Sequence, residues 1–75
     1  MNDFAKDRDW AYPSFVVTVE ERIRWRVCRG YAEAAAAQDG DDAATTIHFM
    51  TRSLYRSDLP TGTQEEIAAL LADEA

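Results

Sequence analysis

The sequence of 75 residues predicts an α+β fold, in which an N-terminal antiparallel β-hairpin is followed by two or three helices. Apolar and polar residues alternate over residues 15–27, an alanine-rich run follows at residues 31–38, and later segments carry apolar residues at helical spacing. A chain of this length forms a single small domain, residues 1–75. We expect residues 1–13 to form an N-terminal arm, because the proline at its end prevents a helix from continuing.

The hairpin prediction depends on a sequence period of two. Odd positions between 15 and 27 are mostly apolar and even positions mostly polar, as expected of a strand with one buried face. A turn at residues 20–22 would bring all six apolar side chains to that face. The facing pairs are then Val19 with Ile23, Val17 with Trp25, and Phe15 with Val27.

An all-α three-helix bundle is the alternative for the same segment. Thr18 and Glu21 have the spacing of a capping box, and the apolar residues that follow recur at intervals of three and four. This stripe comprises Val19, Ile23, Val27, Tyr31 and Ala34. Gly30 and the many β-branched and aromatic residues argue against the helix, whereas a turn without Gly, Asn or Asp argues against the hairpin. We expect the hairpin.

The next part of the chain predicts two helices. The alanine-rich run 31–38 has high helix propensity, and Gly40 can adopt the left-handed conformation that ends a helix. Asp41 or Asp42 caps a second helix, which we expect to be the longest and to stop at residues 57–60.

The C-terminal segment predicts a further helix. Thr63 and Glu66 have the spacing of a second capping box. Ile67, Leu70 and Leu71 supply its apolar side. No internal repeat or flexible linker divides the chain.

Charge and composition limit the classes of function. The net charge of −6 favours a basic partner and disfavours direct contact with nucleic acid. No run of about 18 apolar residues is present, so we expect no membrane span. The single Cys28 and the lack of a signal-peptide pattern predict a cytoplasmic location.

Residues with catalytic chemistry are sparse. His48 is the only histidine, and no cluster at metal-ligand spacing surrounds it. Cys28 and His48 lack the third group that a nucleophile and base pair needs for orientation. We therefore predict a protein without enzymatic activity, metal or cofactor.

An acidic face is the principal candidate for partner binding. Carboxylates displayed on helices complement a basic surface and speed association with it. Four of these residues, Asp41, Asp42, Glu65 and Glu66, also fit predicted helix N-termini, where acidic groups are favourable. The predicted face comprises Glu33, Asp39, Asp41, Asp42, Glu65 and Glu66.

Aromatic anchors and an alternative basic surface complete the candidates. Aromatic side chains often dominate the affinity of protein interfaces, and those predicted here are Trp10, Tyr12 and Tyr55. The alternative surface would bind nucleic acid through basic residues that neutralise phosphates. It comprises Arg22, Arg24, Arg26 and Arg29, which either bind a partner or form a solvated face.

The overall profile resembles the small acidic inhibitors that phages encode against bacterial defence systems, such as anti-CRISPR and anti-restriction proteins. The resemblance rests on chain length, the unpaired Cys28, the lack of an active-site constellation, and acidic doublets. The doublets are Glu20-Glu21, Asp41-Asp42, Glu65-Glu66 and Asp73-Glu74. The resemblance implies that the protein blocks the nucleic-acid surface of an effector without catalysis, in the cytoplasm of a bacterium or a phage-infected host cell.

The predicted function is therefore that of an acidic interaction protein. It binds and blocks a larger basic protein, such as a nucleic-acid-binding effector. A small nucleic-acid-binding or antitoxin-type regulator that uses the arginine-rich segment is the alternative. Both a monomer and a homodimer are compatible with the sequence, because leftover apolar helix surface or an exposed strand edge favours self-association.

Overall fold

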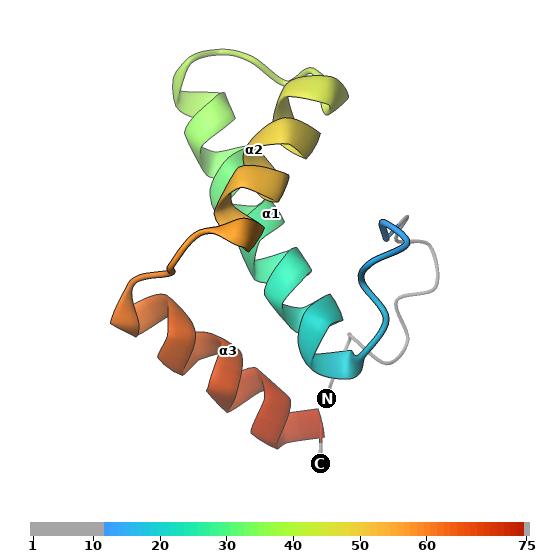
Figure 1. Ribbon diagram of the computed structural model, residues 1–75. Helices are drawn as coiled ribbons and strands as arrows, with labels where there is room; N and C mark the ends of the chain where they lie inside the picture. The colour runs from blue at the N-terminus through green and yellow to red at the C-terminus, as the bar shows by residue number, and fades with distance from the viewer. Residues whose placement is uncertain (1–11, 75) are drawn as a thin grey trace.

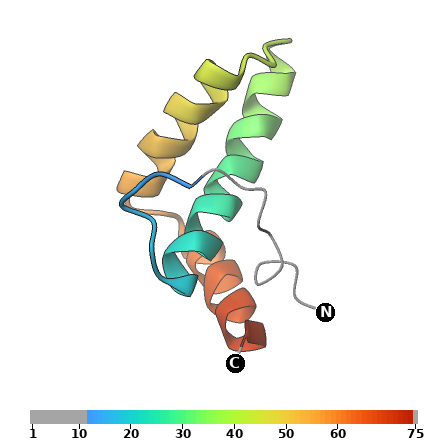
Figure 2. The same ribbon diagram turned by 90° about the vertical axis from the view of Figure 1, so that its right-hand side faces the viewer.

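The computed structural model describes residues 12–74, which fold into three α-helices and contain no β-strand. Helix α1 spans Val19–Gln38, α2 spans Ala44–Arg56 and α3 spans Thr61–Glu74. Helices α1 and α2 run side by side as an antiparallel pair, and α3 packs against the first half of α1 (Figure 1). The segment before α1 passes over the C-terminal end of α2 (Figure 2).

The predicted β-hairpin is wrong, and with it the α+β fold class, whereas the alternative three-helix arrangement fits. The alternation of residues 15–27 has a different physical cause. Ile23 and Trp25 lie about 200° apart on a helix. Both are buried, because Ile23 joins the core formed with α3 and Trp25 contacts α2. A helix covered on two opposite sides thus reproduces the pattern of a strand.

A capping box fixes the start of α1. The Thr18 hydroxyl accepts a hydrogen bond from the Glu21 N–H at 3.1 Å, and the Glu21 carboxylate accepts one from the Thr18 N–H at 2.8 Å. The same carboxylate also accepts from the Val17 N–H at 3.0 Å. These donors hold the pKa of Glu21 below its usual value. Helix-start donors that would otherwise lack partners are satisfied, so the helix begins at Val19.

The turn from α1 to α2 follows the predicted glycine cap. Gly40 has φ of 71°, and the Gly40 and Asp41 N–H groups donate to carbonyls of the last turn of α1. The alanine-rich run 31–38 is not a separate helix, because it continues α1 without a break through Gly30. This makes α1 the longest helix, with 20 residues against 13 in α2, so the prediction that the second helix is longest is wrong.

Helix α2 begins later than its predicted caps. Its N-cap is Ala43, and the Asp41 carboxylate accepts from the Ala43 N–H at 2.9 Å, which closes the turn before the helix. Neither Asp41 nor Asp42 is the N-cap residue. The helix ends at Arg56, and the Ser57 hydroxyl donates to the Leu54 carbonyl at 2.7 Å.

Helix α3 begins at Thr61, two residues before its predicted cap. Thr63 lies within the helix and is buried, so the predicted capping box with Glu66 is wrong. The Gln64 side chain instead donates to the Leu59 carbonyl at 2.7 Å, which ties the first turn to the preceding segment.

The core lies on both sides of α1. One cluster joins α1 to α3 and consists of Ile23, Cys28, Leu59 and Ile67, with Val27, Leu54, Tyr55, Leu70 and Leu71 packed against it. The apolar side predicted for the last helix is therefore confirmed. Ala32 and Ala36 are also buried on α1, seven and eleven residues after Trp25 and therefore on the same side of the helix. Thr51, fully buried on α2, satisfies its hydroxyl by donating to the Ile47 carbonyl at 2.6 Å.

We expect Thr18→Ala to lower the free energy of unfolding by about 1 kcal/mol, because it removes the hydroxyl that accepts from Glu21. Urea denaturation followed by circular dichroism measures the change. Ser53→Ala, at an exposed position within α2, is the control and should alter stability by less than about 0.5 kcal/mol. Equal stability of Thr18→Ala and the unmodified protein would contradict the role of the cap.

Candidate functional site

Glu33 on α1 lies between carboxylates from two other segments. It lines one hollow together with Asp41 and Asp42 of the α1–α2 turn. It also lines a neighbouring groove between α1 and α3 together with Glu66. We call Glu33, Asp41, Asp42 and Glu66 the acidic surface. Three segments of the chain thus contribute carboxylates to two neighbouring hollows, and Arg26 also lines the groove between α1 and α3.

Two of the predicted acidic residues do not line these hollows. Asp39 is exposed at the C-cap of α1, and Glu65 is exposed on the first part of α3. Glu65 directly precedes Glu66 in the chain, and Asp39 lies two residues before Asp41. Four of the six predicted carboxylates therefore line these two hollows, which share Glu33.

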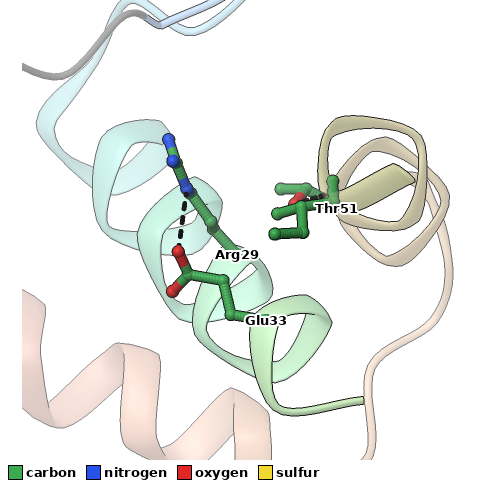
Figure 3. A network of polar contacts seen from close by, with 4 residues as sticks. Arg29, Glu33 and Thr51 are labelled. Atoms are coloured by element: carbon green, nitrogen blue, oxygen red, sulfur yellow. Dashed lines mark hydrogen bonds and ion pairs between the residues drawn. The ribbon is translucent and has the colours of Figure 1, made fainter. Parts of the chain in front are cut away.

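Polar contacts hold two members of the acidic surface in place. Arg29 Nε lies 3.5 Å from a Glu33 carboxylate oxygen, one turn away on α1, as Figure 3 shows. The Tyr31 hydroxyl donates to the Glu66 carboxylate at 3.0 Å and so links α1 to α3. Tyr31 is 49% exposed, although its position in the apolar stripe of the helical alternative suggested the core. It is therefore an aromatic residue beside the acidic surface that the sequence pattern did not identify as an anchor.

The predicted aromatic anchors have other contacts. Tyr12 is half-buried, with the Arg22 guanidinium 5.6 Å from its ring centroid. Tyr55 is half-buried against Phe15 and Trp25, with ring centroids 5.5 Å away in both cases. Burial raises the pKa of the Tyr55 phenol, and the Glu21 carboxylate adds to the effect. The prediction for Trp10 lies outside the described residues.

The four arginines of the alternative basic surface do not share one face. The Arg24 guanidinium donates to the Tyr55 carbonyl at 3.0 and 2.8 Å and to the Ser57 carbonyl at 3.0 Å. It therefore supplies hydrogen-bond donors to carbonyls at the C-terminal end of α2, where a cation is electrostatically favourable. The other three follow a separate stripe of α1 at intervals of four and three, namely Arg22, Arg26 and Arg29.

An aromatic cluster occupies the α2 side of α1. Trp25 is only 2% exposed, and its ring lies 5.9 Å from Phe15 and 5.8 Å from His48, measured between centroids. The guanidiniums of Arg52 and Arg56 each lie 5.9 Å from the Phe15 centroid. This arrangement holds the segment before α1 against the C-terminal half of α2.

Phe49 lies at the solvent-facing edge of this cluster. It is 61% exposed, and its ring centroid is 6.1 Å from that of His48. Both rings line an open groove between α1 and α2 whose other lining residues include Trp25 and Arg29. Sequence reasoning missed this residue, because no polar or charged pattern identifies a single exposed phenylalanine.

The groups with catalytic chemistry do not form a reactive site in the described part of the chain. Cys28 is fully buried, and burial raises the pKa of its thiol although Arg24 opposes the shift. This disfavours the thiolate, which is the nucleophilic form. Between residues 12 and 74, no group of three or more His, Cys, Asp and Glu side chains could hold a metal ion.

Comparison with known proteins gives no relative. No family model, curated protein or solved structure is significantly similar to this chain. Helices α1 to α3 define a small helical domain, and none of them is long and apolar enough to cross a bilayer.

We expect Arg24→Lys to destabilise the protein by about 1–2 kcal/mol, because an ammonium cannot reproduce the forked contacts to two carbonyls. Thermal and urea unfolding measure the loss. Arg22→Lys is the matched control, since it makes the same replacement at an exposed arginine whose guanidinium lies over the Tyr12 ring, and it should change stability by about 0.5 kcal/mol or less. A loss in the control as large as that in Arg24→Lys would contradict the assignment.

Cys28 should react slowly with iodoacetamide in the folded protein. Its thiol is buried and its pKa is raised, so alkylation requires a local opening of the core. We expect a rate on the order of 100-fold below that of the same protein in denaturant, where the thiol is accessible. Comparable rates in the two states, measured by mass spectrometry at one pH, would contradict the buried position.

Proposed function

We propose that this protein is a non-enzymatic interaction protein that binds a basic surface of a larger protein through its acidic surface. The observation that carries the proposal is the position of Glu33 between Asp41 and Asp42 on one side and Glu66 on the other. These carboxylates come from the interior of α1, the α1–α2 turn and α3. Their proximity to Glu33 therefore depends on the packing of the helices and not on the sequence of any one helix.

The electrostatics of the chain support a basic partner. Its net charge of −6 attracts cationic surfaces at a distance, and the local carboxylates give the encounter an orientation. Glu33 is paired with Arg29, and Glu66 accepts from Tyr31, so the side chains of both are held before binding. Less conformational entropy is then lost on association.

Tyr31 adds a candidate anchor to this surface. Its ring is about half exposed beside Glu66, and exposed tyrosines at the centre of an interface often contribute much of the affinity. A cationic side chain of the partner can contact both the carboxylate and the aromatic face.

The proposed partner handles nucleic acid, because such proteins carry the dense basic surfaces that bind phosphates. Occupying that surface inhibits the partner without any reaction, as the profile of phage-encoded inhibitors implies. The proposed place of action is the cytoplasm of a bacterium or a phage-infected cell. Arg24 is engaged with the end of α2, which makes the alternative of nucleic-acid binding by all four arginines less favourable.

We expect removal of three charges from the acidic surface to weaken partner binding. The variant carries Glu33→Gln, Asp42→Asn and Glu66→Gln, which keep side-chain size and change the net charge from −6 to −3. The control carries Glu20→Gln, Asp58→Asn and Asp73→Asn, which give the same net charge at other exposed positions. Each carboxylate that forms a close charge pair with the partner should, when it is removed, weaken the affinity for the partner by a factor of about 10.

The measurement is a tagged capture from bacterial lysate, with and without nuclease, followed by binding assays with the purified captured protein. A basic protein that survives nuclease treatment and binds the control but not the surface variant supports the proposal. Equal binding of both variants would show that overall charge, and not this surface, governs association. Recovery only without nuclease would favour the nucleic-acid-binding alternative.

A further inference from the structure

A small apolar pocket lies where three parts of the chain meet. Helix α1, the last turn of α2 and the segment that leads into α3 (Figure 1) each contribute to it. The volume of the pocket is about 220 Å³. We call it the Cys28 pocket, and its lining residues are Cys28, Tyr31, Leu54, Leu59, Pro60 and Thr63.

The Cys28 pocket has a buried inner wall and an opening to solvent. Cys28, Leu59 and Thr63 are 0%, 6% and 8% exposed, so they form the inner wall. Tyr31 is about half exposed and Pro60 is exposed, so these two residues border the opening. A ligand can therefore enter from solvent and still be enclosed on most of its surface.

The lining of the pocket disfavours both water and ions. Its leucine and proline side chains offer no hydrogen bond, and the Tyr31 hydroxyl already donates to Glu66. A buried water molecule needs about two to four polar partners. Burial also keeps the Cys28 thiol neutral, because it raises the pKa of that group. Among residues 12–74 no charged side chain lines the pocket, so an ion would lose its hydration there without compensation.

The volume of the pocket limits the size of the ligand. Apolar cavities of about 150 Å³ in protein interiors stay dry and bind benzene. The Cys28 pocket is larger, so it has room for one aromatic ring or two fused rings. The Cys28 sulfur is polarizable, and contacts between sulfur and an aromatic ring are favourable. Size and chemistry therefore point to the same class of ligand.

We propose that the Cys28 pocket binds one small neutral aromatic molecule, of the size of benzene or indole. The ring lies against Leu54, Leu59 and the Cys28 sulfur. Its edge faces the opening beside Tyr31. Binding removes apolar surface of the ligand and of the pocket from water. It also fills a void, which is a destabilising feature in a chain of 75 residues with a small core.

This inference does not depend on the proposed function. None of the six lining residues belongs to the acidic surface, and the test requires no partner protein. Tyr31 lies beside both features, so it is not substituted in the test. A pocket that binds no ligand leaves the proposal for the acidic surface unchanged, and failure of partner binding leaves the pocket unchanged.

Titration of the isotope-labelled protein with indole, followed by two-dimensional NMR spectra of the amide groups, tests the pocket. We expect saturable shifts at the residues that line it, with a Kd on the order of 1 mM for a ligand of this size. Benzoate has a similar ring but carries a charge, so it should bind at least about 10-fold more weakly. No saturation with indole, saturation only at residues outside the pocket, or equal affinity for benzoate would overturn the proposal.

Variants that fill the pocket give a second test. Thr63→Leu adds apolar volume at the inner wall and should weaken indole binding by about 10-fold or more. Thr61→Leu is the matched control, because it makes the same replacement at an exposed position of α3 and should leave the affinity unchanged. Leu54→Phe fills the pocket from α2 and replaces Thr63→Leu if circular dichroism shows that variant to be unfolded. Equal indole affinity of a filled variant and the control would overturn the proposal.

Discussion

Burial of α1 on two opposite sides is the constraint on which the rest of the structure depends. Trp25 faces α2 and the segment before α1, whereas Ile23 belongs to the core shared with α3. A chain of 75 residues cannot enclose a large core, so one helix supports both neighbours. The acidic surface follows from this arrangement, because Glu33 on α1 borders the turn to α2 and the groove beside α3.

Polar contacts at helix ends stabilise the fold in addition to the small core. The Thr18 and Glu21 capping box fixes where α1 starts, and Arg24 satisfies carbonyls where α2 ends. Both groups are close in sequence to Trp25. The first two turns of α1 therefore combine the start of the helix, the end of its neighbour and the centre of the aromatic cluster.

Local sequence signals were sufficient to predict two features of the fold. Residues close in the sequence were sufficient to predict the cap at Gly40 and the apolar side of the last helix. The capping box at Thr18 also indicated a helix start, but the alternation from Phe15 to Val27 favoured a strand. Alternation distinguishes a strand from a helix only when one side of the helix is exposed, and tertiary packing covers both sides of α1.

The candidate site was predictable as a list of residue types but not as an arrangement. Negative charge identified Glu33 and Glu66, yet their common groove depends on how α3 packs against α1. Arg24 has the same chemistry as its neighbours in the sequence, and only its position beside the end of α2 gives it a structural role. The exposure of Phe49 is known only from the structure, because a phenylalanine is normally expected in the core.

The attachment of α3 has a consequence for cooperativity. This helix packs mainly against α1, and its link to α2 is the short segment around the buried Leu59. Such an element can open as its own unit while the α1–α2 pair stays folded, and its amide hydrogens then exchange first. Opening moves Glu66 away from Glu33. A ligand that contacts both carboxylates binds only the closed form, so by thermodynamic linkage its binding slows hydrogen exchange throughout α3.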